Sequence, residues 1–407
     1  MTYSTISVPL HGELTSCVLY RDRLGAASKY ALLWLFIGTE QVCLAWRRMC
    51  DPDRSFCRIP AMADVSVPGS IAIQPDDVRI IRALQVAPRA SFASMAAALG
   101  LTEGAVRRRY RRLHTDGVIR VVGVVNPGAL GQSRWLVRLR CRPGSAAAIA
   151  GALAKRDDVN WVALGAAGSE VTCATQSRDQ AQREELLGQR LPRTAAVLDI
   201  NAFAMLRQFM GGRGHYWAAL HGTLTPQEEA MLGSDSPPFT ESPAVTDDPV
   251  HLTTEDEAML EMLAADGRAS LVELATAADS TPGRVSRRLR VLLLHRVVHI
   301  DIEIAPAALG YHARANLWLR VHPSQVKKVG RSLAREPEIA FAAAISGPYN
   351  IHAVAHCRDL DELFEFTSDR IGGLPGLQSM EVSPVLRHVK QAGTLLSGDR
   401  LAGPPAR

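Results

Sequence analysis

An internal repeat constrains this chain more than any other feature of its sequence. Residues 77–131 align without a gap on residues 256–310 at an offset of 179, and 19 of the 55 aligned positions are identical. Arg89-Ala90-Ser91, for example, matches Arg268-Ala269-Ser270. Short periods indicate solenoids, but a period this long indicates two copies of a larger folding unit.

Each copy is predicted to open with three short helices. Thr254 with Glu257 and Ser270 with Glu273 fit capping boxes, in which two side chains satisfy free amide groups at a helix start. In the first copy, Thr102 is expected to cap the third helix. The short turn before it contains Gly100, and two helices around such a turn are typical of a helix-turn-helix.

Runs rich in β-branched residues follow the third helix at 118–125 and 297–304 and are predicted as wings. In the second run, three isoleucines alternate with His299, Asp301 and Glu303, which indicates a half-buried strand. The remainder of each copy reads as strand, helix, strand, strand, helix, strand, an order typical of a ferredoxin-like sandwich.

The predicted fold class is therefore α+β, with two copies of an N-terminal winged helix-turn-helix followed by a ferredoxin-like βαββαβ sandwich. The linker is expected to be mobile because it is rich in Gly, Ser, Pro and acidic residues. The predicted segments are an unassigned tail (1–70), winged helix-turn-helix 1 (71–131), ferredoxin-like effector and dimerisation domain 1 (132–210), linker (211–251), winged helix-turn-helix 2 (252–310), ferredoxin-like domain 2 (311–390) and a tail (391–407).

The first 61 residues differ in composition from the rest, since they hold four of the seven cysteines and two of the six tryptophans. Cys43, Cys50 and Cys57 are too widely spaced for a usual structural zinc site. We expect translation to begin at or near Met62. The three scattered cysteines of the main body do not form a disulfide framework, which favours a reduced, cytoplasmic protein. The apolar stretch 30–46 is short and polar for a membrane span, so no membrane role is expected.

The candidate DNA-binding residues lie on the third helix of each copy. Arginines on a helix in the major groove contact guanine edges and phosphates. Because Val106, Tyr110 and Leu113 form the expected buried stripe, Arg107, Arg108 and Arg111 are predicted to face the groove. The full candidate set is Thr102, Arg107, Arg108, Arg109, Arg111 and Arg112 in the first copy, and Arg284, Arg287, Arg288 and Arg290 in the second.

The two copies differ in charge. Residues 77–131 hold nine basic and three acidic residues, a net charge of +6, whereas residues 256–310 hold six and eight, a net charge of −2. Attraction to phosphate depends on this local sign. We therefore predict that the first copy dominates DNA affinity, while the second aids specificity or assembly.

The helix-turn-helix, the wing ending in Asn126-Pro127-Gly128-Ala129-Leu130-Gly131 and the βαββαβ sandwich together resemble the Lrp/AsnC family of regulators, in a tandem form. The resemblance covers about residues 74–208 and 252–390. It implies transcriptional regulation, double-stranded DNA as partner, homo-oligomers formed through the sandwiches, and often a small effector such as an amino acid.

In that family, a turn of form Gly-x-x-Asp between the second and third strands borders the effector pocket. Gly347-Pro348-Tyr349-Asn350 is a near match, so the resemblance makes Gly347, Tyr349 and Asn350 the candidate effector residues. The glycine also suits a simple hairpin turn. His352 and His356 lie on one face of a predicted strand, where packing is the favoured role.

The sequence thus predicts a sequence-specific DNA-binding regulator, with no catalytic residues, metal or cofactor. An enzyme is the alternative, because siroheme decarboxylases share this regulator-like architecture. They use pocket histidines and arginines on tetrapyrrole carboxylates. The five-arginine helix argues against the enzyme, which does not need it.

Overall fold

The structure is a computed structural model that describes residues 72–177, 180–210, 217–233 and 251–403, with the backbone of two N-terminal strands. These strands, β1 (Tyr3–Leu10) and β2 (Glu13–Tyr20), pair as an antiparallel hairpin, so residues 1–70 hold secondary structure that the sequence did not predict. Met62 lies outside the described residues. The chain divides into two units, Met1–Gly69 and Ser70–Arg407, and the second is described below. Within the described residues, no helix is long and apolar enough to cross a membrane.

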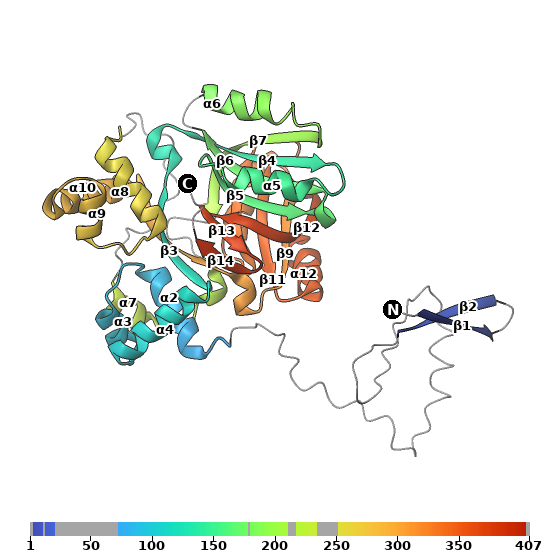
Figure 1. Cartoon of the computed structure of the whole chain (residues 1–407), viewed down its shortest axis with the longest axis horizontal. Coiled ribbons are helices and arrows are strands. Elements are labelled where there is room, and N and C mark those ends of the chain that lie inside the picture. The colour runs from blue at the N-terminus through green and yellow to red at the C-terminus, as the bar shows by residue number, and fades with distance from the viewer. Residues whose placement is uncertain are drawn as a thin grey trace, which may run out of the picture. The chain divides into compact units, whose positions relative to one another are not determined.

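Two four-stranded antiparallel sheets form the centre of the second unit (Figure 1). Their strand orders, β5-β6-β4-β7 and β10-β11-β9-β12, are those of a ferredoxin-like sandwich, and the order of elements along the chain is the predicted one. The elements are β4 (Ser133–Cys141), α5 (Ala146–Ala154), β5 (Val159–Gly165), β6 (Glu170–Ser177), α6 (Gln180–Glu184) and β7 (Val197–Met210), then β9 (Ala313–Val321), α11 (Val326–Leu333), β10 (Ile339–Ile345), β11 (Ile351–Cys357), α12 (Leu360–Glu365) and β12 (Leu377–Gln391).

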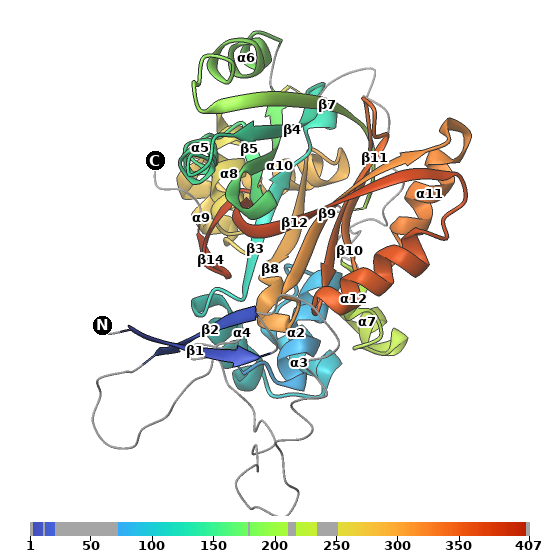
Figure 2. The ribbon, with the colours of Figure 1, turned by 90° about the vertical axis from the view of Figure 1, so that its right-hand side faces the viewer.

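The edges of the two sheets join within the one chain. Strand β7 pairs with β10, and β12 pairs with β5 as well as with its own neighbour β9. The eight strands therefore close into a ring of paired strands, with the helices outside (Figure 2). Closure removes the edge strands that would otherwise be free to pair with another chain.

Alternation along the strands gives each sheet two different faces. On β11, Ile351, Ala353, Ala355 and Cys357 belong to the core beneath the helices. The intervening His352, Val354 and His356 point the other way, into the space inside the ring of strands. This inner face carries polar side chains, so the space inside the ring of strands is lined by polar as well as apolar groups.

The two winged-helix units each contain three helices and a strand. Thr102 caps the third helix of the first unit as predicted, and the equivalent Thr281 caps that of the second. The capping box at the start of the second unit is formed by Thr253 with Asp256, one residue before the predicted pair Thr254 and Glu257. The units comprise α2 (Pro75–Val86), α3 (Phe92–Leu99), α4 (Glu103–Thr115) and β3 (Ile119–Val125), and α8 (Thr254–Ala265), α9 (Leu271–Ala277), α10 (Pro282–Leu294) and β8 (Val298–Ile304).

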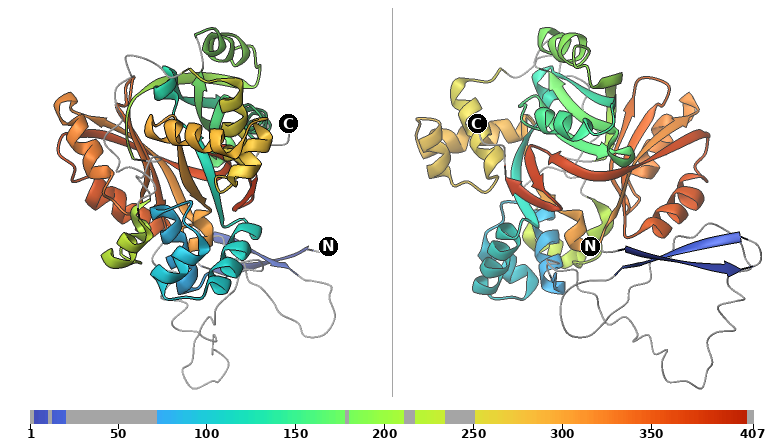
Figure 3. Two further views of the ribbon diagram at one scale, coloured as in Figure 1. Left: turned by 90° about the vertical axis from the view of Figure 1, so that its left-hand side faces the viewer. Right: turned by 45° about the vertical axis from the view of Figure 1, so that its right-hand side comes forward.

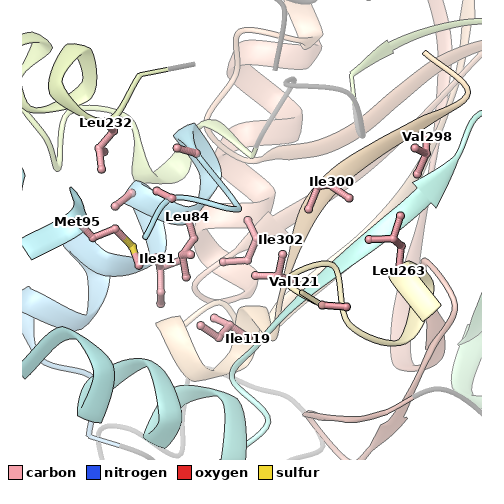
Figure 4. Packing of buried hydrophobic residues seen from close by; sticks show 14 of the residues in the cluster. Ile81, Leu84, Met95, Ile119, Val121, Leu232, Leu263, Val298, Ile300 and Ile302 are labelled. Atoms are coloured by element: carbon pink, nitrogen blue, oxygen red, sulfur yellow. The ribbon is translucent and has the colours of Figure 1, made fainter. Parts of the chain in front are cut away.

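The predicted wings pair with each other. Strand β3 runs antiparallel to β8, with Val122 opposite Asp301 at the middle of the ladder. The isoleucines of β8 are buried and His299 and Asp301 are half-buried, as the alternation predicted, but Glu303 is buried as well. One hydrophobic core extends through both units across this ladder, from Ile81 and Met95 to Ile300 and Leu263 (Figure 4).

Corresponding arginines fasten the two units to each other. Arg89 donates to the carbonyl oxygens of Gly267 and Ala269. Arg268, its equivalent in the repeat, donates to the carbonyl oxygens of Pro88 and Ala90. The contacts are reciprocal, as at an interface between two copies of one surface.

Two predicted irregular segments contain secondary structure. Within the predicted linker, α7 (Pro226–Leu232) lies against α2 and α3, where Glu228 pairs with Arg79 and Glu229 with Arg82. Within the predicted tail, β13 (Thr394–Ser397) and β14 (Arg400–Gly403) extend the sheet beyond β12. Figure 3 shows both segments beside the first winged-helix unit. The prediction of a mobile linker is therefore wrong for residues 217–233.

Candidate functional site

A buried aspartate fixes the third helix of each winged-helix unit. Asp77, with no exposed surface, accepts from Arg109 at 3.0 Å and also pairs with Arg112. In the second unit, Asp256 accepts two bonds of 2.6 Å from Arg288, a bidentate pair. Burial opposes ionisation of Asp256, but hydrogen bonds from Arg288 and Thr253 outweigh burial and hold its pKa below the ordinary value.

Three of the ten predicted DNA-binding residues therefore have a structural role. Arg109, Arg112 and Arg288 tie the third helix to the first, because a buried carboxylate needs a charged partner. Sequence reasoning missed both aspartates. The signal was available, since Asp77 and Asp256 correspond in the repeat and each stands in the first turn of a helix.

The outer face of α4 carries the remaining arginines of the first unit. Arg108 and Arg111 are exposed and make no ion pair within the part of the chain that the structure describes. Arg107 is exposed too, paired at 2.6 Å with Glu103 one turn earlier. The hydroxyl oxygen of Thr102 accepts a hydrogen bond from the backbone amide of Ala105, so this side chain caps the start of α4. The three arginines predicted for the groove thus share a solvent-facing surface.

On α10 two of these three positions again carry arginine, and the position of Arg107 is occupied by Ser286. Arg287 and Arg290, the equivalents of Arg108 and Arg111, are exposed without ion pairs among the described residues. Arg284 is exposed and lies 3.3 Å from Glu255. Each unit therefore presents exposed arginines, and in the second unit Glu255 lies beside one of them, Arg284.

The predicted effector turn lies between β10 and β11. Gly347 has a φ of +102°, and a Cβ there would come within 2.7 Å of the Phe203 ring. The hydroxyl of Tyr349 donates to Glu381, and the side-chain amide of Asn350 bonds both the amide and the carbonyl of Val321. All three residues are thus in place at one turn, with their polar groups engaged by the protein.

A cavity of about 260 Å³ lies inside the ring of strands, next to the β3–β8 ladder. Its walls come from both halves of the chain. The first half contributes mainly Arg134, Leu136, Asn160, Trp161, Met205 and Gln208, and the second contributes His299, Asp301, Phe341, His352, Val354, His356, His388 and Gln391. The sequence singled out only His352 and His356 of these residues. The structure confirms that they share one face of a strand.

The buried histidines of the cavity are uncharged. Burial, with smaller contributions from Arg138 and Arg314, lowers the pKa of His352 and of His356 to about 3. Burial also lowers the pKa of His388 well below its ordinary value. Around the described residues, no group of three or more His, Cys, Asp or Glu side chains is arranged to hold a metal ion.

Comparisons with known proteins match both types of domain. The AsnC-type helix-turn-helix domain matches residues 76–114, and the Lrp/AsnC ligand binding domain matches residues 314–395. An HTH-type transcriptional regulator of Pyrococcus abyssi is 30% identical over 145 residues, which are 35% of this chain and 91% of that protein. The regulator FL11 of Pyrococcus horikoshii is 28% identical over 147 residues, 36% of this chain and 97% of that protein.

Among solved structures, the siroheme decarboxylase NirDL is similar with a TM-score of 0.53 and 14% sequence identity. The match covers 78% of this chain and 92% of that one. At this identity the likeness concerns the fold alone.

Proposed function

Because this chain belongs to the Lrp/AsnC family of helix-turn-helix transcriptional regulators, we propose that it is a tandem regulator whose two halves act as a dimer within one chain. The observation that supports this best is the reciprocal contact of Arg89 and Arg268 beside the β3–β8 ladder. Two winged-helix units held in this way present two third helices at a fixed separation. Regulator dimers read half-sites about 10 base pairs apart, or multiples of that distance.

In this proposal, Arg107, Arg108 and Arg111 on α4 supply most of the affinity for DNA. They are exposed on the helix that the family inserts into the major groove, and the Asp77 ion pairs keep that helix in place. The exposed Arg284, Arg287 and Arg290 of α10 contact a second half-site, and the negative net charge of residues 256–310, with Glu255 beside Arg284, weakens that contact.

The test is fluorescence anisotropy of the full chain with DNA from its own promoter region and with unrelated DNA, across a salt series. We expect promoter DNA to bind at least about a thousandfold more tightly than unrelated DNA. The logarithm of the binding constant should fall linearly with the logarithm of salt concentration.

The triple variant Arg107→Ala, Arg108→Ala, Arg111→Ala should lose this promoter affinity. Its matched control replaces Arg140, Arg142 and Arg193, which are exposed arginines outside the winged-helix units. Because the control removes the same charge, equal losses in both variants would contradict the assignment of α4.

We further propose that an amino-acid effector contacts the turn at Gly347, Tyr349 and Asn350. Such a ligand would compete with Glu381 for the hydroxyl of Tyr349 and with Val321 for the side chain of Asn350. These two hydrogen-bonded contacts link the turn to β12 and β9. An amino-acid panel added to the anisotropy assay tests this. An effector whose action survives Tyr349→Phe and Asn350→Ala together would refute the placement.

Assembly beyond one chain is also part of the proposal. The edge pairs β7–β10 and β12–β5 already join the two sandwiches in cis, so homo-oligomers would form through their outer surfaces. Light scattering across a concentration series, with and without DNA, measures this. A chain that stays monomeric at all concentrations would remove oligomers from the proposal.

A tetrapyrrole enzyme is the second candidate, because His352, His356, His388 and Arg134 share one cavity. The cavity volume of about 260 Å³ argues against it, since a cavity of about 150 Å³ takes up a single benzene ring. A four-pyrrole macrocycle needs far more room. An intense visible absorption band on addition of siroheme, followed by loss of carboxyl groups as carbon dioxide, would favour the enzyme.

A further inference from the structure

The cavity inside the ring of strands has no part in DNA binding as proposed above. Its lining includes Asn160 and Trp161 from β5, Phe341 from β10, His352 and His356 from β11, and His388 from β12. None of these residues belongs to α4, α10 or the Gly347 turn. The cavity therefore needs its own explanation.

Several polar atoms of the lining have no hydrogen-bond partner among the described residues. They include both ring nitrogens of His356, Nδ1 of His352 and the side-chain oxygen of Asn160. His356 is 6% exposed and His352 is 1% exposed. A buried polar group without a hydrogen-bond partner destabilises the folded protein, so these atoms favour a bound molecule that pairs with them.

The hydrogen-bonding character of two of these atoms is defined. Nε2 of His352 lies 3.2 Å from the side-chain oxygen of Asn316, which can only accept. Nε2 therefore carries the proton, and Nδ1 of the neutral ring is an acceptor. Asn160 adds a second acceptor, and a neutral His356 offers one donor and one acceptor. A ligand that pairs with all of them carries both donors and acceptors.

Aromatic rings make up much of the remaining surface. The ring of Trp161 lies 5.1 Å from that of His388, and the ring of Phe341 lies 5.9 Å from that of His352, measured between centroids. Flat faces of this kind favour a flat ligand. Since about 150 Å³ is enough for benzene, a cavity of about 260 Å³ suits one or two fused rings.

Burial opposes the charged forms of three side chains that line the cavity. Burial keeps His352 and His356 unprotonated, as described above, and burial also raises the pKa of Asp301 to about 6, against a hydrogen bond from the amide of Ile302. Arg134, which lines the cavity as well, donates to Gln208. A charged ligand would lose its hydration in the same surroundings, so a neutral one is favoured.

We propose that this cavity binds an uncharged, flat heteroaromatic molecule of one or two fused rings that carries both N–H donors and nitrogen or carbonyl acceptors. Purine bases are molecules of this class. The site is separate from the turn at Gly347. Because binding is measured without DNA, the proposal does not depend on the regulatory function.

The experiment titrates the full chain with hypoxanthine and with quinazolin-4-one at pH 7, using calorimetry and tryptophan fluorescence. We expect saturable binding at one site per chain and a change in the emission of Trp161. His356→Leu should weaken binding at least about tenfold, as expected for a lost pair of hydrogen bonds. His312→Leu replaces an exposed histidine outside the cavity and should leave the affinity unchanged.

Ala174→Leu fills the cavity without removing a polar group and should abolish binding. Circular dichroism establishes whether each variant is folded. If His356→Leu does not fold, the loss of binding in Ala174→Leu tests the proposal instead. Three results would overturn the proposal: no binding of either probe at millimolar concentration, equal binding of the anion 2-naphthoate, or binding that both cavity variants leave unchanged. Binding of hemin that His356→Leu abolishes would replace the proposed ligand class with tetrapyrroles.

Discussion

The two winged-helix units have the same backbone plan and opposite charge. Gly100 and Gly117 adopt positive φ values in the first unit, and the corresponding Asp279 and Arg296 keep positive values of 45° and 55° without glycine. The net charge nevertheless falls from +6 to −2 across the repeat. The comparison teaches that the same turn conformations are compatible with opposite net charge, and without glycine at either position.

Within the described residues, the first unit is also contacted by two elements, α7 and β14, that have no equivalent beside the second unit. Helix α7 lies on α2 and α3, and the amide of Leu401 in β14 donates to the carbonyl of Gly117 at 2.9 Å. A side chain at position 117 would come within 2.7 Å of the Leu401 oxygen. Close contact with Leu401 therefore requires glycine at position 117. The equivalent position in the second unit accommodates the large side chain of Arg296.

The largest expected effect separates the third helices of the two units, α4 and α10. Arg108→Ala with Arg111→Ala should weaken promoter binding about a hundredfold, because each good contact to a base is worth about 1–3 kcal/mol. Arg287→Ala with Arg290→Ala, the matched pair on α10, should cost less than about tenfold. Anisotropy at one salt concentration measures both, and a larger loss in the second pair would reverse the comparison.

The buried aspartates should respond differently to loss of one arginine. Among the described residues, Arg288 is the one arginine that pairs with Asp256, whereas Asp77 retains Arg112 when Arg109 is removed. Arg288→Ala should lower the free energy of unfolding by ~2–3 kcal/mol, somewhat less than for a fully enclosed pair because Arg288 is partly exposed. Arg109→Ala should lower the free energy of unfolding by clearly less than Arg288→Ala does. Urea unfolding measures both, and equal losses would show that Arg112 does not compensate.

The halves also differ inside the ring of strands, where the buried histidines all come from the second half. Because the pKa of His356 is about 3 in the folded chain and near 6.5 when unfolded, the unfolded chain binds more protons between these values. Stability should therefore fall as the pH falls from 6.5 towards 3. His356→Leu should make this slope shallower by up to about 1.4 kcal/mol per pH unit. The slope of His312→Leu should stay unchanged in urea unfolding at several pH values.

The smallest effect concerns the helix that supports only the first unit. Glu229→Ala removes the partner of Arg82, and a partly exposed ion pair contributes at most about 1 kcal/mol. The midpoint of thermal unfolding should fall by a few degrees or less. A large decrease would mean that α7 is essential for the first unit to fold.

The sequence predicted the elements of both halves because their signals are local. Caps such as Thr102 and Thr281 and the alternation along β8 involve neighbouring residues. The pairing of β3 with β8 and the closure of the ring depend on contacts between residues far apart in the chain, and no local pattern encodes them.

Differences among the arginines of α4 have the same origin. The exposure of Arg107, Arg108 and Arg111 could be predicted because the apolar stripe of α4 defines its opposite face. Arg109 and Arg112 looked equivalent to them until Asp77 was placed in three dimensions. Likewise, a lone histidine such as His388 gives no signal in sequence, since its neighbours in the cavity come from other strands.

The β3–β8 ladder has a further consequence for how the molecule responds to dilution. In a two-chain regulator, the pair of reading helices separates as protein concentration falls, so occupancy of DNA depends on two equilibria. Here the partner of each unit is on the same polypeptide and remains at a high effective concentration. The paired form should therefore persist at the few copies per cell at which a two-chain regulator would be mostly apart.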